Sequence, residues 1–344
     1  MRTIRFPLLL AATMLLLAAP GQAAEAPLAT TTHFAFHSDL ATNLNDALVV
    51  TAEARGRDRP ELFESGDEQE CFDGLAPSAR LGWDLAVDWY AEVVAEGGWM
   101  GRPQSLLRHD LAGLPGRDDG ERARRFLSIA RGFLATASPA YEACRWPDQQ
   151  AENRRWISEL VPRVETHGAA LTSRIEKAFG ASYHGLPLRV DVVGHAPPVG
   201  ANTIWLSPAG GHILVSSGLS RTDAFEIVFH ESAHTLMRRS DPVPRALAAA
   251  AGELRIEEPR DLWHVLLFYN VGDATKRTLD AAGEGGEAGY TPYLYAKPHL
   301  WGGRWGRYRE AVEAHWPGYL AGEVSLDAAM AALLGDLRDD DDAN

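Results

Sequence analysis

The chain has 344 residues, and its 33 Lys and Arg against 47 Asp and Glu give a formal net charge of −14 at pH 7. Nucleic acids and anionic membrane surfaces attract basic proteins, so this charge argues against both as partners. The length suffices for one large domain or two lobes with a substantial hydrophobic core.

The N-terminal residues are typical of a secretory signal peptide. Arg2 and Arg5 precede an apolar run over residues 7–19, and small residues follow up to Ala24. A basic start, a short hydrophobic segment and small residues at a cleavage site mark such a peptide, and the run is too short for a comfortable transmembrane helix. We therefore assign residues 1–23 to a signal peptide and expect a periplasmic or secreted protein that has no membrane contact after cleavage.

The chain contains two cysteines, Cys71 and Cys144. An oxidising compartment outside the cytoplasm favours their pairing, so export predicts a disulfide between them. Two free thiols buried in the core are the alternative. Neither cysteine stands near another candidate ligand in the sequence, so we expect neither to bind a metal.

The first half of the mature chain has the hydrophobic periodicity of helices. Apolar residues recur at helical spacing over residues 76–96, 121–134 and 147–179. Pro162 is expected to break or kink the third of these helices. Residues 24–180 are therefore predicted to form a helical N-terminal lobe.

The pattern changes near Gly180, where polar and apolar residues begin to alternate as they do in strands. Strands are predicted over residues 188–193, 203–206 and 212–216, and further helices over residues 244–254, 260–281 and 304–315. The expected fold class is therefore α+β and mostly helical, with a second lobe over residues 181–335. The acidic run Asp339–Asp342 lies in a C-terminal segment, residues 336–344, that we expect to be a disordered tail.

The sequence His230-Glu231-Ser232-Ala233-His234 carries the strongest functional signal. Two histidines four positions apart lie on one face of a helix, so both imidazoles can bind a single Zn²⁺. Glu231 beside them can take a proton from water that the metal activates. Upstream, Ser220 and Asp223 form an S-x-x-D capping signal that predicts the start of this helix. An ordinary core helix that contains two histidines is the alternative.

Strands followed directly by a capped HExxH helix resemble the zincin metallopeptidases, over residues 188–299 and on this one motif. The resemblance implies a small sheet followed by an active-site helix, a catalytic zinc, and Glu231 as the general base that acts on peptide bonds. It also implies that extended substrate pairs with the strand before the helix, His212–Ser216. Met237 and Ser240 stand where the metzincin pattern HExxHxxGxxH requires glycine and histidine, and the gluzincin NExxSD and aspzincin GTxDxxYG sequences are absent.

The third metal ligand has four candidates downstream of the motif, which are Glu253, Glu257, Glu258 and His264. We prefer His264, because it lies in a helix that is apolar almost all round, where a buried imidazole needs a polar partner and a metal is one. Pro259 is expected in the first turn of that helix, which places His264 early in it. The alternatives are a core histidine bonded to a carbonyl, and metal binding by one of the glutamates.

Peptide hydrolysis also needs a group that stabilises negative charge on the substrate oxygen. Tyr290 and Tyr293 follow the glycine-rich stretch Gly283–Gly289, which could deliver either phenol to the site, and His299 is a weaker candidate. Packing against the core is the alternative for each tyrosine.

The sequence predicts an exported zinc-dependent metallopeptidase with a peptide or protein substrate and no nucleic-acid partner. The predicted metal ligands are His230, His234 and His264, and the predicted catalytic residues are Glu231, Tyr293 and Tyr290. Two other functions remain open, a noncatalytic exported binding protein with a degenerate zincin fold and a hydrolase of non-peptide amides. Retention of Glu231 argues against the first, because a binding protein has no use for a general base.

Overall fold

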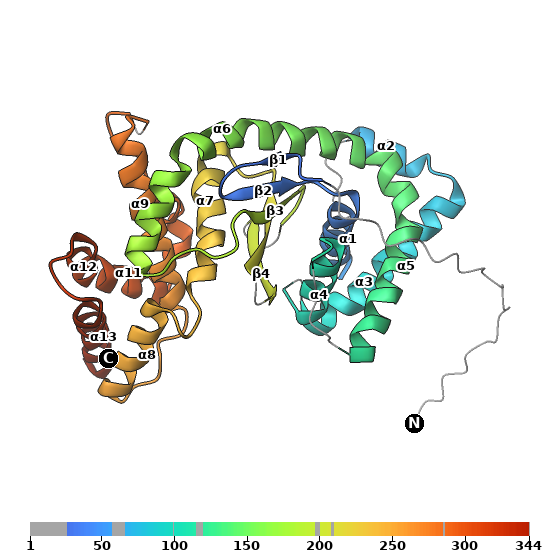
Figure 1. Cartoon of the computed structure of the whole chain (residues 1–344). Helices are drawn as coiled ribbons and strands as arrows, with labels where there is room; N and C mark the ends of the chain where they lie inside the picture. The colour runs from blue at the N-terminus through green and yellow to red at the C-terminus, as the bar shows by residue number, and fades with distance from the viewer. Residues whose placement is uncertain are drawn as a thin grey trace, which may run out of the picture.

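The computed structural model describes residues 26–56, 66–98, 100–114, 120–196, 200–207, 210–284 and 286–343. The signal peptide predicted over residues 1–23 lies outside them. Across the described residues the fold is α+β, as predicted, because helices dominate and one five-stranded mixed sheet lies among them (Figure 1). None of the helices in these ranges is both long enough and apolar enough to cross a membrane.

Five helices in the first half of the chain form a helical unit with a core of its own. They are α1 (Leu40–Gly56), α2 (Gly66–Asp73), α3 (Pro77–Gly97), α4 (Arg102–Leu111) and α5 (Gly120–Cys144). Trp83 and Tyr90 are fully buried in this core, where they lie two turns apart on the same face of α3. The predicted disulfide is present, since Cys71 and Cys144 join α2 to the end of α5 with their Cα atoms 5.5 Å apart.

The sheet lies between the helical unit and the C-terminal helices. Its strands are β1 (Ala29–Thr30), β2 (Phe34–His37), β3 (Leu188–Val193), β4 (Ala201–Ser207) and β5 (Gly210–Ser216), in the spatial order β1-β2-β3-β5-β4. β2, β3 and β5 run parallel, and the outer strands β1 and β4 are antiparallel to their neighbours. The three strands predicted from the sequence are confirmed. β1 and β2 were not predicted, because strands of two and four residues are too short to show alternation.

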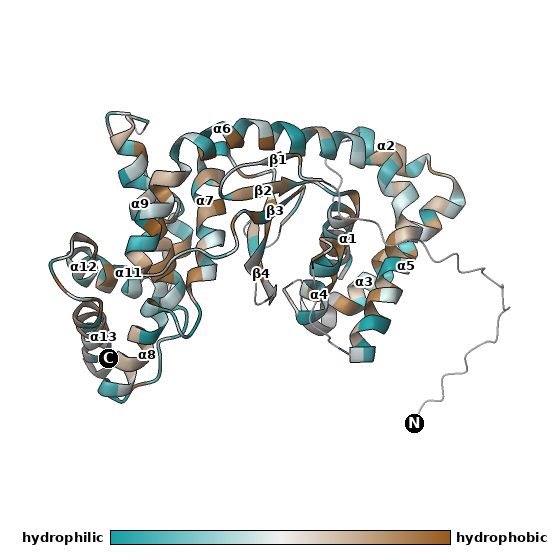
Figure 2. Ribbon diagram, viewed as in Figure 1, coloured by the Kyte–Doolittle hydropathy of each residue, from teal (hydrophilic) through white to brown (hydrophobic). Residues whose placement is uncertain are grey.

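The longest helix, α6 (Trp146–Phe179), arches over the sheet and connects the helical unit to the rest of the chain (Figure 1). Its buried face, which includes Trp156 and Leu171, packs in one core with the sheet. Figure 2 shows α6 in teal over much of its visible length, as expected for a helix that covers a core with one face only. Pro162 lies inside α6 without breaking it, because the turns on both sides are anchored in the same core and offset the missing hydrogen bond.

The helical lobe predicted over residues 24–180 is not a single unit. β2 pairs in parallel with β3, so the segment before α1 belongs to the sheet. Phe34 and Phe36 of β2 are buried in the core that the sheet shares with α6. The helical unit α1–α5 is therefore inserted between β2 and α6. Sequence order could not reveal this, because β2 and β3 stand on opposite sides of the inserted helices along the chain.

The remaining helices follow the sheet and complete its core. They are α7 (Arg221–Ala233), η1 (His234–Leu236), α8 (Pro242–Leu254), α9 (Leu262–Ala281), α10 (Tyr293–Ala296), η2 (Pro298–Trp301), α11 (Arg304–His315), α12 (Pro317–Ala321) and α13 (Leu326–Ala343). The three helices predicted in this region are confirmed as α8, α9 and α11. The prediction of a disordered tail from residue 336 is wrong, because α13 continues past this residue. Leu337 is only 4% exposed and packs in the core with Leu333 and Leu334.

Candidate metal centre

The HExxH sequence lies at the end of α7, against the sheet. The helix begins as predicted, because the hydroxyl oxygen of Ser220 accepts a hydrogen bond of 3.1 Å from the backbone N–H of Asp223. Its α-helical part ends at Ala233, and His234 starts the 3₁₀ turn η1. The second histidine nevertheless stays beside the first, since the ring centroids of His230 and His234 lie 5.2 Å apart.

Helix α9 brings a third histidine to the same place. His264 is the third residue of α9, early in the helix as predicted, although Pro259 precedes the helix instead of lying in its first turn. One ligand atom from each of His230, His234 and His264 lies within 4.8 Å of those of the other two. In the described part of the chain, this is the one group of three or more His, Cys, Asp or Glu side chains close enough to share a metal ion.

The spacing of the imidazoles suits a tetrahedral metal ion. The Nε2 atoms of His230 and His264 face each other at 3.2 Å. Two nitrogen ligands at about 2.0–2.1 Å from a tetrahedral Zn²⁺ stand roughly 3.3–3.4 Å apart, so this distance fits two ligands of one zinc ion. Three protein ligands leave one position for water or substrate, which is the arrangement of catalytic zinc sites rather than of closed structural ones.

Burial keeps all three imidazoles in the neutral form that binds metals. Loss of hydration lowers the pKa of His230 well below its ordinary value, and the neighbouring His234 and His264 lower it further. Burial first, and His264 second, lower the pKa of His234 to about 3. Burial also lowers the pKa of His264 to about 4, although Asp261 opposes the change. At neutral pH no proton therefore competes with a metal for these nitrogens.

Glu231 is buried next to the three imidazoles and is held by Thr203 of β4. Its Oε2 lies 2.6 Å from the Thr203 hydroxyl and 3.8 Å from Nε2 of His234. Burial raises the pKa of Glu231 to about 7, and the hydrogen bond from Thr203 limits the rise. A carboxyl group with this pKa can both accept and return a proton near neutral pH. The sequence analysis missed Thr203, which carries no local signal and reaches Glu231 only because β4 packs against α7.

Three aromatic side chains surround the imidazoles. The ring centroid of Phe268 lies 3.8 Å from that of His230. The Trp263 ring stacks on His264 with centroids 4.9 Å apart, and Trp305 meets His264 edge-on at 5.5 Å. These contacts restrict the orientations of the imidazole rings and give the cluster an apolar wall.

The carboxylates considered as third ligands lie elsewhere. Glu253, Glu257 and Glu258 are exposed, and none of them belongs to the group that could hold a metal. Glu258 lies 4.0 Å from Arg239 instead. The geometry therefore favours His264 as the third ligand.

Both candidate tyrosines are anchored by Glu226, a buried carboxyl group that the sequence analysis did not identify. The Tyr290 hydroxyl donates a hydrogen bond of 2.9 Å to Oε2 of Glu226, and the backbone N–H of Tyr293 donates one of the same length to the same oxygen. Burial raises the pKa of Glu226 to about 7, against the effect of these two hydrogen bonds. Because its phenol is engaged by Glu226, Tyr290 is not assigned as an oxyanion donor, contrary to expectation.

Tyr293 contacts Phe268, which lies against the cluster. Its ring stacks on Phe268 with centroids 6.3 Å apart, and Phe268 in turn covers His230. His299 is exposed in η2. The structure gives no contact that would assign Tyr293 or His299 to the stabilisation of an oxyanion, so their catalytic role stays a prediction.

The prediction that the strand His212–Ser216 binds substrate is wrong, because of the order of the strands in the sheet. β5, which contains His212–Ser216, lies between β3 and β4 and pairs with both. Its backbone groups are therefore not a free edge. The strand at this end of the sheet is β4, which runs antiparallel to β5 and carries Thr203.

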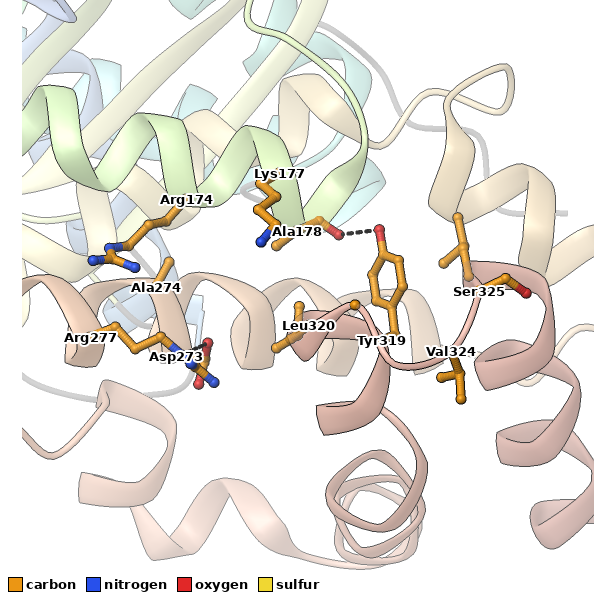
Figure 3. Close-up of a pocket in the computed structure, with 12 residues that line it drawn as sticks. Arg174, Lys177, Ala178, Asp273, Ala274, Arg277, Tyr319, Leu320, Val324 and Ser325 are labelled. Carbon is orange, nitrogen blue, oxygen red and sulfur yellow. Dashed lines mark hydrogen bonds and ion pairs between the residues drawn. The ribbon is translucent and has the colours of Figure 1, made fainter.

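A separate cavity of about 310 Å³ opens between α6, α9 and the connection from α12 to α13 (Figure 3). None of the candidate site residues lines it. Arg277 in its lining pairs with Asp273 at 2.7 Å, and Lys177 lies in the last turn of α6, where a cation stabilises the carbonyl end of the helix. Tyr319 closes one wall by donating a hydrogen bond of 3.0 Å to the carbonyl of Ala178. These interactions account for Arg277, Lys177 and Tyr319 in the lining of the cavity.

Comparison with known proteins assigns no family. No protein-family model matches the chain, and no curated protein or solved structure matches it either. The inference of function therefore depends on the site itself.

Proposed function

We propose that this protein is an exported zinc-dependent metallopeptidase, with His230, His234 and His264 as metal ligands and Glu231 as general base. The observation that carries the proposal is the convergence of three neutral imidazoles beside a buried carboxyl group. The resemblance of the strands and capped HExxH helix to the zincins supports it as well.

Zinc in a site of this kind supplies Lewis acidity, which activates water and polarises a substrate carbonyl. The chain itself supplies the proton transfer. Glu231, whose pKa is about 7, accepts the proton of the attacking water and returns it to the leaving amine. Thr203 orients the carboxyl group through its 2.6 Å hydrogen bond and so holds it in one position for both transfers.

Further observations support the proposed substrate class and location. An extended peptide could pair with the edge strand β4, which lies beside Glu231, in the way that the resemblance implies for zincins. The disulfide between Cys71 and Cys144 suits an oxidising compartment, and this agrees with export by the signal peptide that residues 1–23 predict.

A noncatalytic zinc-binding protein is the second candidate. The observation that favours it is the engagement of Tyr290 by Glu226, which leaves the oxyanion without an assigned donor among the described residues. Zinc binding without hydrolysis of any member of a broad peptide library would support this second candidate.

The deciding experiment compares the purified wild-type protein with Glu231→Gln, both loaded with one equivalent of zinc, on a library of unstructured peptides read by mass spectrometry. We expect the variant to lose hydrolysis by roughly 100-fold or more while it keeps its zinc. Glu253→Gln, which changes an exposed carboxylate on α8, is the matched control and keeps full activity. Equal hydrolysis by the wild type and Glu231→Gln contradicts the proposal.

A further inference from the structure

Trp263 is the exposed aromatic residue at the rim of the three-histidine cluster. Its side chain is 38% exposed, and it is the one aromatic residue among the eight large apolar side chains exposed in the described part of the chain. Single exposed apolar residues are common and need no function. Trp263 differs from the others because it contacts two of the candidate metal ligands.

The indole of Trp263 is partly exposed and contacts two of the candidate metal ligands. The indole stacks on His264 with centroids 4.9 Å apart and 17° between the ring planes, and it meets His234 at 5.6 Å and 68°. The partly exposed indole thus lies against two of the three imidazoles, next to the place where a metal at the cluster would hold a peptide bond.

The surroundings of the indole favour an apolar occupant. The nearest carboxylate in sequence, Asp261, accepts a hydrogen bond of 2.6 Å from Arg304 and lies 3.9 Å from Arg260. Its charge is thus compensated and does not attract a cationic side chain to the indole. On the other side of His264, Trp305 extends the aromatic wall.

We propose that the exposed surface of the Trp263 indole binds a large apolar or aromatic side chain of the substrate, in a residue next to the peptide bond that is cleaved. The inference rests on the proposed peptidase function, because that function places substrate at the three-histidine cluster. Trp263 then determines specificity, since an indole face gains most from stacking with an aromatic side chain and from excluding water from an apolar one.

The test separates binding from catalysis by using Glu231→Gln, which holds substrate without cleaving it. Zinc-loaded Glu231→Gln and the double variant Glu231→Gln/Trp263→Ala are titrated calorimetrically with two peptides. The peptides differ only in a Phe or an Ala beside the bond that the wild type cleaves. We expect the single variant to bind the Phe peptide about tenfold more tightly than the Ala peptide, and this preference to fall below about twofold in the double variant.

Two further substitutions distinguish the indole face from general damage. Trp263→Phe keeps an aromatic face and retains most of the preference, whereas Ile129→Ala, at an exposed position on α5, leaves the preference unchanged. Any loss of zinc weakens the binding of both peptides alike. The ratio of the two affinities therefore measures only the contribution of the contact with the indole. In the active background, Trp263→Ala lowers kcat/KM for the Phe peptide about tenfold more than it lowers that for the Ala peptide.

The experiment distinguishes a failure of the proposed role of Trp263 from a failure of the proposed peptidase function. An unchanged Phe preference in the double variant, while the wild type still hydrolyses peptides, overturns the role of Trp263 and leaves the proposed function standing. A zinc-loaded wild type that hydrolyses no peptide overturns the proposed function, and the role of Trp263 with it.

Discussion

Replacing Glu226 by glutamine should make the protein more stable at pH 8 and change its stability much less at pH 5. Glu226 is fully buried, and burial raises its pKa from 4.5 to about 7. Each unit of pKa difference between the folded and unfolded states corresponds to 1.36 kcal/mol, so ionising Glu226 in the folded protein costs about 3 kcal/mol. The folded state binds this proton more tightly than the unfolded state does. The corresponding stability is therefore fully present below pH 4.5 and is lost as the pH rises through 7.

Glutamine is a suitable mimic of the protonated acid at this position. Its carbonyl oxygen can accept the hydrogen bonds of Tyr290 and Tyr293, and its NH₂ group replaces Oε1, which has no partner. The variant has no proton to lose at this position. The difference in free energy of unfolding between Glu226→Gln and the wild type should therefore grow by about 2 kcal/mol between pH 5 and pH 8. The histidines of the cluster titrate in both proteins, so their contribution cancels.

The assay is urea denaturation of both proteins at pH 5, 6.5 and 8, with a chelator present so that metal binding does not contribute. Glu253→Gln, at an exposed position on α8, is the control and should show no difference that depends on pH. A difference between Glu226→Gln and the wild type that stays constant within about 0.5 kcal/mol would contradict the prediction, because Glu226 would then titrate alike in the folded and unfolded states.

Three other perturbations test the site and the fold. Thr203→Val removes the hydroxyl that limits the rise in the pKa of Glu231, so it should lower kcat/KM about tenfold and move the acidic limb of the pH–rate profile to higher pH. Thr203→Ser keeps the hydroxyl and should leave kcat/KM and the profile close to those of the wild type. A profile that does not move would contradict the assigned contact. Replacing Cys71 and Cys144 by serine should lower the free energy of unfolding by about 4 kcal/mol, given their separation of 73 residues, and equal stability in urea would contradict a stabilising disulfide. Phe36→Ala on β2 should cost about 3–5 kcal/mol by the same assay, and a loss below about 1 kcal/mol would show that β2 is not part of the core.

The region around the motif could be predicted because its signals are local. Ser220 and Asp223 mark the start of the helix, and the spacing of His230 and His234 places both rings on one side of it. His264 is 30 positions downstream of His234 in a different helix, yet its isolation in an apolar segment indicated that a polar partner had to exist. The structure brings these rings together, although the metal itself stays a prediction.

The remaining features depend on how distant segments pair, which one sequence does not encode locally. Strand β5 comes directly before the motif in the sequence, which suggested an edge strand. In the sheet it lies between β3 and β4, and sequence order does not reveal this. Thr203 meets Glu231 across the contact between β4 and α7. Tyr290 follows a glycine-rich stretch, which suggested that its side chain could move to the site. In the structure its hydroxyl is hydrogen-bonded to the buried carboxyl group of Glu226.

Zinc stoichiometry, measured by elemental mass spectrometry on the mature protein, shows whether the three histidines form a metal centre. His264→Ala is measured beside the wild type, and His299→Ala, which removes an exposed histidine outside the cluster, is the matched control. We predict about one zinc ion per chain in the wild type and in the control, and its loss in His264→Ala. A wild-type protein that binds no zinc, or a His264→Ala variant that keeps all of it, would contradict the three-histidine centre.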